Sequence, residues 1–326
     1  MAPTPFLAGV MCLVLDLMHI MRTVFVDSTK YVLGLVKNKE AAMASYYSGK
    51  TVLITGASSG LGKEFALQLM NLSLKAKCPI HLVLSARSQS TLAHVAKLCN
   101  EISSKSKIMI IPVDLGKFND PNEVSAYMQE LDKKLKESGL PGVDCLINNA
   151  GVSSRGSALE TDQASLDMVM QINFFGPVAI TKAILPDMVA RGTGGAVAVV
   201  SSVQGRLGIP LRTSYAASKH AVQGYFDCLR GEIAKARITT TLISPGYIRT
   251  SLSLNAVTGN GTKYGVTDET TASGMDPGYA ARESLYAIAQ GTTDFLLAEG
   301  KVLAAIQAKA QFPQLLAKLT SKRMKG

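Results

Sequence analysis

The chain has 326 residues, of which 47% are hydrophobic and 18% charged, so it can bury a large core and is not a disordered chain. The net charge is +10, from 34 basic and 24 acidic residues, which suits nucleic acid, an anionic membrane or phosphorylated ligands. No zinc-finger spacing, RNA-binding motif or basic–aromatic repeat is present, so we expect no nucleic-acid partner. The five cysteines form no CxxC pair and the four histidines show no metal spacing, which predicts reduced thiols and no metal site.

Residues 1–47 are predicted to form an N-terminal hydrophobic anchor and linker. Residues 6–26 are an apolar run of transmembrane length, interrupted by a polar stripe that includes Asp16 and His19. A central aspartate costs about 2.5–3.5 kcal/mol in a membrane span, so a helix lying in the membrane interface is the alternative. A cleaved signal peptide fits less well, because no basic side chain precedes the run. Lys30, Lys37 and Lys39 follow it, which favours the cytosolic side for the domain beyond.

Apolar runs and helical patterns alternate through the middle of the chain. We predict strands at 51–55, 80–85, 108–113, 143–148, 196–201 and 239–244, and helices at 60–72, 94–102, 123–137, 162–188 and 214–236. Strands this apolar are expected when helices cover both faces of a sheet. The alternation therefore predicts an α/β protein with a doubly wound parallel sheet, the Rossmann fold, and ligands at the carboxyl ends of the strands. Pro177 is expected to perturb the helix 162–188.

A glycine-rich turn follows the first strand and opens the first helix, in the string Thr55-Gly56-Ala57-Ser58-Ser59-Gly60-Leu61-Gly62. Glycines at these places allow a tight turn and a close approach of the backbone to a pyrophosphate at a helix N-terminus. A glycine-rich turn alone is a weak signal, but between a strand and a helix it is specific. The turn predicts a dinucleotide site.

The second strand ends without the acidic residue that an NAD site places on the ribose 2′-hydroxyl. Arg87 stands there instead and can pair with a 2′-phosphate, so we favour NADP(H) over NAD(H). The alternative is an exposed arginine that contacts nothing. Asp114, at the end of the third strand, is predicted to accept a hydrogen bond from adenine or, alternatively, to cap the next turn.

Tyr215 and Lys219 lie four residues apart, so on a helix their side chains share one face. An ammonium beside a phenol favours the phenolate and lowers the phenol's pKa from ~10, which suits a general acid or base. Ser202 stands thirteen residues before Tyr215 and is the candidate serine of the site, with its neighbour Ser201 as the alternative. Beside a dinucleotide site, this pair predicts hydride chemistry on a carbonyl or alcohol. The alternative is an ordinary amphipathic pair.

Six motifs occur in a fixed order, namely Gly56-x3-Gly60-x-Gly62, Asn148-Asn149-Ala150-Gly151, Asn173, Ser202, Tyr215-x3-Lys219 and Pro245-Gly246. In this order, roughly residues 48–300 resemble the short-chain dehydrogenase/reductase family and are expected to form one catalytic domain. Three longer strings resemble a membrane-associated subgroup of that family more closely, beginning at Asn173, Tyr215 and Ser244. The segment between Gly62 and Arg87 is longer than is usual in the family and lacks its glycine, which predicts a longer surface loop.

The resemblance implies a role for each catalytic residue. Tyr215 would be the general acid or base, and Lys219 would lower its pKa and bind the nicotinamide ribose. Ser202 would bind the substrate oxygen, and Asn173 would hold a water that links Lys219 to solvent. Asn148 would mainly brace the sheet. The implied cofactor contacts are Gly56, Ser58, Ser59, Gly60, Leu61, Gly62, Arg87, Asp114, Asn149, Ala150, Gly151, Tyr215, Lys219, Pro245, Gly246, Ile248 and Thr250.

Residues 251–275 are rich in Gly, Thr and Asn and are placed to act as a substrate lid. Their apolar side chains could line a pocket or anchor the loop, namely Leu252, Leu254, Val257 and Tyr264. Arg155, Arg206 and Arg212 flank the catalytic motifs and would grip an anionic headgroup or, in the favoured alternative, lie in solvent. The subgroup resemblance implies a lipophilic substrate, such as acyl- or alkyl-dihydroxyacetone phosphate. A steroid or retinoid ketone is the enzymatic rival, and a catalytically silent nucleotide-binding scaffold is the alternative of another class.

The last segment, 301–326, is predicted to be a basic amphipathic helix that contacts a membrane surface or packs on its own domain. The resemblance implies a membrane-associated protein, in the endoplasmic reticulum or alternatively the peroxisome. The chain does not end in a peroxisomal tripeptide. The helices 162–188 and 214–236 are those that the family uses for dimerisation, so a homodimer is expected unless neighbouring helices cover their outer faces.

Overall fold

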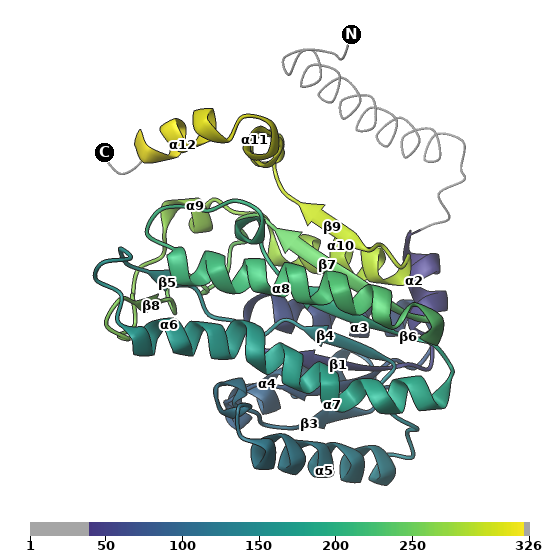
Figure 1. The fold of residues 1–326 in the computed structure, drawn as a ribbon. Coiled ribbons are helices and arrows are strands. Elements are labelled where there is room, and N and C mark those ends of the chain that lie inside the picture. The colour runs from purple at the N-terminus through teal and green to yellow at the C-terminus, as the bar shows by residue number, and fades with distance from the viewer. Residues whose placement is uncertain (1–38, 323–326) are drawn as a thin grey trace, which may run out of the picture.

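The computed structural model describes residues 39–322, built around one parallel sheet (Figure 1). Its seven strands lie in the order β3-β2-β1-β4-β6-β7-β9, and every neighbouring pair is parallel. They are β1 (Thr51–Thr55), β2 (His81–Ser85), β3 (Ile108–Ile110), β4 (Cys145–Asn148), β6 (Gly195–Val200), β7 (Ile238–Pro245) and β9 (Asp294–Leu297). The order reverses between β1 and β4, which confirms the predicted doubly wound fold.

The seventh strand, β9, is missing from the sequence prediction. It is a four-residue edge strand that begins with the exposed Asp294 and is only half-buried beyond it. Edge strands lose the continuous apolar run that marks a central parallel strand. Only the pairing of Leu242–Pro245 with Asp294–Leu297 identifies it.

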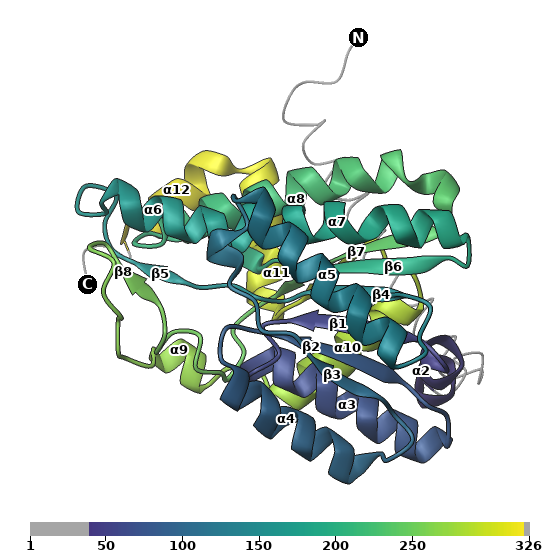
Figure 2. The same cartoon turned by 90° about the horizontal axis from the view of Figure 1, so that it is seen from below.

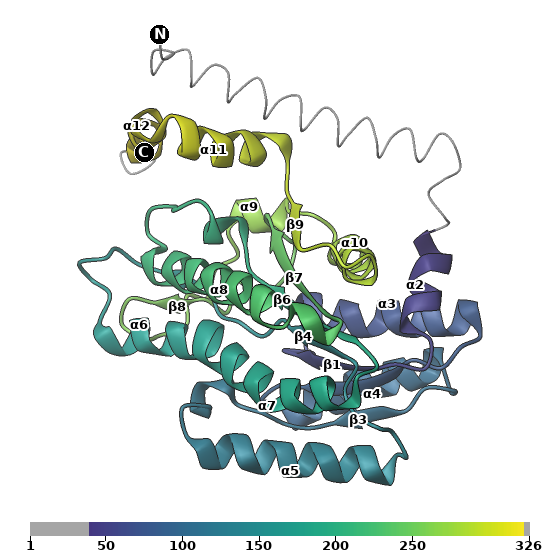
Figure 3. The same cartoon turned by 45° about the vertical axis from the view of Figure 1, so that its right-hand side comes forward.

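Helices cover both faces of the sheet, as Figures 2 and 3 show. One face carries α2 (Lys39–Tyr47), α3 (Gly60–Ala76), α4 (Gln89–Ile102) and α10 (Pro277–Ala289), which share one hydrophobic cluster. The other face carries α5 (Pro121–Glu137), α7 (Gly176–Arg191) and α8 (Thr213–Glu232), which share a second cluster. Strands that are buried on both sides explain the apolar runs in the sequence.

Helix α3 runs four residues beyond its predicted end. It stops at Ala76, with Lys77 in the left-handed conformation at φ 55°. The extra residues between Gly62 and Arg87 therefore lengthen this helix, and the predicted longer surface loop is wrong. Ser73 explains the extension, because its buried hydroxyl donates to the carbonyl of Cys78 at 2.6 Å and lies 3.0 Å from the hydroxyl of Ser103.

The predicted helix 162–188 is a composite of three segments. Helix α6 (Gln163–Met170) leads into a π-helical turn (Gln171–Phe175) and then into α7. The perturbation lies just before Pro177, because proline has no N–H to donate to the carbonyl of Asn173 four residues earlier. The span Gln163–Arg191 is the one helix among the described residues that is long and apolar enough to cross a membrane. Its inner face packs into the second cluster, so we interpret it as a core helix; the predicted anchor 6–26 lies outside the described residues.

The C-terminal segment is two helices, α11 (Gly300–Gln311) and α12 (Pro313–Lys322), where one was predicted. Phe312 separates them at φ −134° and ψ 60°, a non-helical conformation, because a following proline disfavours the helical region for the residue before it. Lys309 on α11 donates to the carbonyl of Arg206 at 2.7 Å, so this helix contacts the catalytic domain.

Candidate active site

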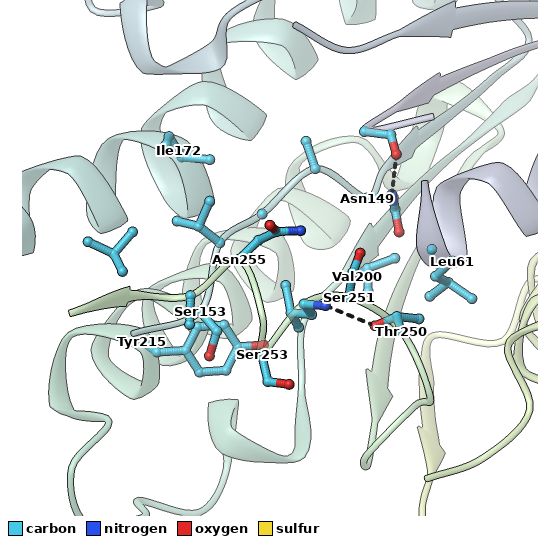
Figure 4. A pocket seen from close by; sticks show the side chains of 18 of the residues that line it. Leu61, Asn149, Ser153, Ile172, Val200, Tyr215, Thr250, Ser251, Ser253 and Asn255 are labelled. Atoms are coloured by element: carbon cyan, nitrogen blue, oxygen red, sulfur yellow. Dashed lines mark hydrogen bonds between the residues drawn. The ribbon is translucent and has the colours of Figure 1, made fainter. Parts of the chain in front are cut away.

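A cavity of about 610 Å³ opens at the carboxyl ends of the strands, where the order of the sheet reverses. Figure 4 shows Leu61, Asn149, Tyr215 and Thr250 around one space. Every residue predicted to bind the cofactor lies on its wall except Gly62, and every predicted catalytic residue does except Asn173. The tertiary structure therefore gathers segments far apart in the sequence into one site.

The glycine turn is compact because a side chain at Gly56 or Gly62 would collide with neighbouring backbone. Gly56 has a φ of +66°, and a Cβ on it would lie 2.8 Å from Cα of Ala150. A Cβ on Gly62 would lie 2.2 Å from the carbonyl oxygen of Gly56, so only a glycine at position 62 leaves room for the turn. Gly62 itself does not line the cavity. The side chain of Asn149 donates to the carbonyl of Thr55 at 2.9 Å and ties the turn to the loop after β4.

Thr55, the first residue of the glycine-rich string, supports the site from the end of β1. Its hydroxyl oxygen accepts the backbone N–H groups of Asn149 and Ala150, each at 3.0 Å. These two bonds join the ends of β1 and β4, between which a cofactor would lie. The only sequence signal is a threonine at the end of an apolar strand, which is common in strands without any such role.

The N-terminus of α3 lies at the cavity, whose wall includes Ser58, Ser59 and Gly60. Ser59 is the N-cap residue, and its side chain makes no capping hydrogen bond. The positive end of a 17-residue helix and its free N–H groups favour a bound anion such as a pyrophosphate. The cradle therefore fits a dinucleotide.

Arg87 and Asp114 lie at the ends of neighbouring strands on the same wall. Arg87 is exposed and, within residues 39–322, forms no ion pair. Asp114 caps the 3₁₀ turn Leu115–Lys117, since its Oδ1 accepts from the N–H of Gly116 at 3.0 Å. The capping alternative is thus observed for Asp114, and its contact with adenine stays a prediction.

Tyr215 and Lys219 lie on one face of α8 and are almost fully buried, at 6% and 4% exposure. The ammonium of Lys219 lies 5.7 Å from the ring centroid of Tyr215 and donates to the carbonyl of Val200 at 2.8 Å. Burial lowers the pKa of Lys219 to about 8. The four-residue spacing on α8 therefore places the two side chains side by side, and the last residue of β6, Val200, holds the ammonium of Lys219.

The phenol of Tyr215 has a raised pKa, which differs from the sequence expectation. Burial is the dominant cause, and it outweighs the lowering by the hydrogen bond with Ser202 and by the charges of Arg155 and Arg212. Lys219 was expected to supply the lowering, but its own charge is destabilised by the same burial. Of the groups that favour the phenolate, Ser202 and Arg155 come from other segments and Arg212 from the N-cap of α8.

Ser202 and Ser201 face different neighbours. The hydroxyl of Ser202 accepts from the N–H of Gln204 at 3.1 Å and lies beside the phenol. The hydroxyl of Ser201 instead donates to the carbonyl of Lys219 and accepts from the side chain of Gln223. This geometry favours Ser202 as the group that meets a substrate oxygen.

Asn173 sits in the π-helical turn, behind the cavity wall. Its Oδ1 accepts from the N–H of Val152 at 2.8 Å, and its Nδ2 donates to the carbonyl of Val152 and to the hydroxyl of Ser218. A Cβ on Gly151 would lie 3.1 Å from Oδ1 of Asn173 and 3.5 Å from Nζ of Lys219. Asn173 therefore braces the loop after β4, and its part in a proton relay stays a prediction. Asn148 donates to the hydroxyl of Thr181 at 2.9 Å, which joins β4 to α7.

The three flanking arginines all form ion pairs. Arg155 and Arg212 line the cavity, both bound to Asp268, with side chains 10% and 13% exposed. Arg206 pairs with Asp294 at the surface, with its side chain 27% exposed, and does not line the cavity. The favoured expectation of arginines in solvent is therefore wrong for Arg155 and Arg212, and only these two could meet a ligand in this cavity.

The segment 251–275 contributes residues to the cavity wall, and its action as a lid stays a prediction. Its strand β8 (Val257–Thr258) pairs with β5 (Ser154–Arg155), and it carries α9 (Glu269–Ala272). Leu252 and Val257 are on the wall, whereas Leu254 and Tyr264 are not.

Asp268 on the lid and Tyr247 on the wall are among the residues of the site that the sequence did not predict. The hydroxyl of Tyr247 is buried, lies on the cavity wall and has no hydrogen-bond partner in the described part of the chain. Tyr247 followed a quoted Pro-Gly motif, but nothing local distinguished it. Asp268 had no signal, because its partners are far away in the sequence.

A doubly wound sheet with a glycine cradle and a buried serine–tyrosine–lysine set defines a nicotinamide-dependent oxidoreductase. The family model for short chain dehydrogenases matches residues 50–260, and the chain belongs to that family. It is 43% identical over 275 residues to dehydrogenase/reductase SDR family member 7B of Danio rerio, covering 84% of this chain and 85% of that protein. It is 44% identical over 267 residues to dehydrogenase/reductase SDR family protein 7-like of Anopheles gambiae, covering 81% and 80%. The subgroup resemblance, to the member 7B type, is confirmed.

Solved structures show the same fold at low identity. A short-chain dehydrogenase/reductase from Burkholderia phymatum in complex with NAD gives a TM-score of 0.69 at 22% identity, covering 82% of this chain and 95% of that chain. An alcohol dehydrogenase from Thermococcus sibiricus complexed with 5-hydroxy-NADP gives 0.60 at 20% identity, covering 77% and 95%. Both dinucleotides thus occur among these neighbours.

Proposed function

We propose that the protein is an NADP(H)-dependent reductase that converts a lipophilic ketone to a secondary alcohol. The observation that carries this proposal is the buried pair of Tyr215 and Lys219, with Ser202 beside the phenol, on the wall that also holds the glycine cradle. The nicotinamide, when bound in the cradle, supplies the hydride.

The chain's own residues handle the proton and the developing charge. Ser202 donates a hydrogen bond to the carbonyl oxygen of the substrate, and the phenol of Tyr215 protonates that oxygen as negative charge builds on it. Lys219 holds a positive charge near the phenol and would bind the nicotinamide ribose. The burial of both side chains excludes water, so these interactions are stronger than in solvent.

The preference for NADP(H) rests on Arg87. It stands just after β2, exposed on the cavity wall, and no acidic residue in 39–322 pairs with it, so its guanidinium can pair bidentately with a 2′-phosphate. Ser88, next to it, caps α4, since its hydroxyl oxygen accepts from the N–H of Thr91 at 3.4 Å.

The substrate class rests on the charged part of the wall. In an acyl- or alkyl-dihydroxyacetone phosphate, the phosphate lies only a few bonds from the ketone, so a cation near Tyr215 can reach it. Arg155 and Arg212 line the cavity with that phenol, and together they exceed the charge of their shared Asp268 by one. Leu252 and Val257 on the lid would meet the apolar tail. A neutral steroid or retinoid ketone would make no use of the excess charge.

We also propose a membrane-associated location, in the endoplasmic reticulum. The support is the apolar run 6–26 in the sequence and the similarity to member 7B relatives.

The test of the reaction is Tyr215→Phe in the full chain. We expect loss of ketone-dependent NADPH oxidation, with the affinity for NADPH kept within about threefold because the phenyl ring is retained. Turnover that survives in Tyr215→Phe would contradict the mechanism. A wild-type protein that binds NADPH and turns over no ketone from a panel of lipids, steroids and retinoids would favour the scaffold instead.

The test of the substrate class compares lipid profiles of cells with and without the protein, followed by kinetics on the ketone that accumulates. We expect Arg155→Gln to raise KM for a phosphate-bearing ketone by about tenfold, the loss of one charge-assisted contact. KM for a neutral ketone should stay the same. An equal rise in KM for both ketones would contradict a phosphate-bearing substrate.

A further inference from the structure

Ionisable groups from several segments line the same cavity as Tyr215. They are Lys219 from α8, Arg212 from the N-cap of α8, Arg155 from β5 and Tyr247 after β7, and the two arginines bind Asp268 from the lid. The charges of both arginines act to lower the pKa of the phenol. Lys263 also lies on the cavity wall. The proposed function uses only Lys219 to tune the phenol, although that cation is turned toward Val200.

Arg155 is held firmly next to the backbone of Tyr215. Its Nη1 donates to the hydroxyl of Ser153 at 2.6 Å and to the carbonyl of Ser154 at 2.8 Å. The hydroxyl of Ser154 accepts from the N–H of Tyr215 at 3.2 Å. The guanidinium also lies 5.6 Å from the ring centroid of Tyr264. Five donors in a planar fork suit such a fixed position.

Arg212 binds the same carboxylate as Arg155, that of Asp268, but comes from a different segment. It is the N-cap residue of α8, three residues before Tyr215, and its carbonyl accepts from the N–H of Ala216 at 2.8 Å. Its Nη2 donates to Oδ2 of Asp268 at 3.1 Å. Residue 212 also pairs with Gly156 in a parallel β-bridge, which fixes the loop of Arg212 beside the strand of Arg155.

The two arginines share one carboxylate. Oδ2 of Asp268 accepts from both Arg155 and Arg212, and the three side chains are only 10%, 13% and 15% exposed. Burial opposes the ionisation of Asp268, but the hydrogen bonds and charges of the arginines outweigh it and hold its pKa below the ordinary value. Two cations and one anion leave one positive charge in a poorly solvated place, where it acts strongly on its neighbours.

We propose that Arg155 and Arg212 are positioning residues for proton transfer at Tyr215, and that Asp268 sets how much of their charge reaches the phenol. This inference rests on the proposed function of Tyr215 as the proton donor. Their charge stabilises the phenolate that remains after Tyr215 has given up its proton. Because Asp268 belongs to the lid, a lid that lifts away takes the counter-charge with it, so lid position and proton transfer are coupled.

The direct test is an alkaline titration of the full chain in detergent, followed by the ultraviolet absorbance of tyrosinate. Subtracting the titration of Tyr215→Phe isolates the phenol of interest, and circular dichroism marks the highest pH at which the fold is intact. Arg155→Gln and Arg212→Gln should decrease the ionised fraction of Tyr215 at that pH. Asp268→Asn should increase it, equivalent to a midpoint at least about half a pH unit lower. A purely structural role predicts no such opposite signs.

Arg206→Gln is the matched control, because Arg206 pairs with Asp294 and does not line the cavity. It should leave the titration unchanged. Arg212→Lys retains the charge and should lie closer to the wild type than Arg212→Gln, which separates charge from packing if the glutamine variants are poorly folded. Failure of Asp268→Asn to raise the ionised fraction, or the same sign for Asp268→Asn and Arg212→Gln, would overturn the inference. No ketone is needed, so a wrong proposed function would appear separately, as turnover by Tyr215→Phe.

Discussion

The ammonium of Lys219 donates to the carbonyl oxygen of Val200 at 2.8 Å, so the lysine next to the proposed proton donor is anchored by β6. This bond fixes the cation but does not offset the loss of solvation in a site that exposes 4% of the lysine. The pKa of Lys219 consequently falls from its ordinary value of 10.5 to about 8. The buried ammonium of Lys219 therefore lowers the stability of the fold, and we attribute its presence to the proposed catalytic role.

Lys219→Met should therefore stabilise the protein and abolish turnover. A lysine whose folded pKa lies below its unfolded pKa binds more protons when unfolded, so its penalty is full below about pH 8 and disappears as the pH rises toward 10.5. The shift is worth roughly 3 kcal/mol at most, and the lost hydrogen bond to Val200 offsets about 1–1.5 kcal/mol of it.

We expect the free energy of unfolding of Lys219→Met to exceed that of the wild type by about 1–2 kcal/mol at pH 7, as measured by urea denaturation. The difference should shrink as the pH is raised above 8. A variant that is less stable than the wild type at pH 7 would contradict the burial penalty.

Gly62→Ala should disrupt the glycine turn. The new Cβ would lie 2.2 Å from the carbonyl oxygen of Gly56 and 2.5 Å from the side-chain nitrogen of Asn149, so the turn has to move. We expect a loss of NADPH affinity of at least tenfold, measured by fluorescence titration, and a loss of stability of about 1–3 kcal/mol from overpacking. Gly224→Ala is the control, since nothing lies within 4 Å of its Cβ position inside α8. It should bind NADPH normally and gain up to about 1 kcal/mol of stability.

Thr55→Val should weaken the joint between β1 and β4. It keeps the shape of the side chain but removes the acceptor for the N–H groups of Asn149 and Ala150, at a cost of about 2–4 kcal/mol for two unsatisfied donors. Thermal and urea unfolding measure this loss. Thr55→Ser keeps the hydroxyl and should recover most of it. Equal stability of the valine and serine variants would mean that the hydroxyl does not hold the loop.

Arg87→Gln should decrease the affinity for NADPH and leave the affinity for NADH unchanged. The glutamine removes the charge that would pair with the 2′-phosphate, and one such contact is worth about tenfold in Kd or more. Lys97→Gln removes an equally exposed charge from α4, away from the cavity, and should change neither affinity. Tighter NADH binding by the wild type would contradict the proposed preference for NADP(H).

We propose a homodimer through the helices of the second face, and Phe175→Glu should weaken it. Phe175 is 50% exposed, and Val189 on the same composite helix is 45% exposed. A charge in an apolar interface is strongly unfavourable, so the mass from light scattering in detergent should fall toward that of a monomer. Leu159→Glu, at a side chain 99% exposed in a loop, is the control. A wild type that is monomeric at all concentrations tested would remove the dimer.

Sequence patterns were reliable where the information is local. The apolar runs predicted six of the seven strands, because a strand buried between helices has to be apolar throughout. The glycine turn and the four-residue spacing of Tyr215 and Lys219 also depend only on nearby residues. The end of α3 was missed, because Ser73 holds it through contacts with Ser103 and Ser106 that no helix pattern contains.

The sequence by itself determined the family, the Rossmann fold and the identity of the proposed acid, because each depends on residue types at short, fixed spacings. Only the tertiary structure decided which groups act on the phenol. Asp268 lies 113 residues after Arg155 and 56 after Arg212, yet a single oxygen of it binds both. Charges that meet over such separations leave no periodic trace in the chain. Their effect on Tyr215 depends on burial and distance, which exist only after folding.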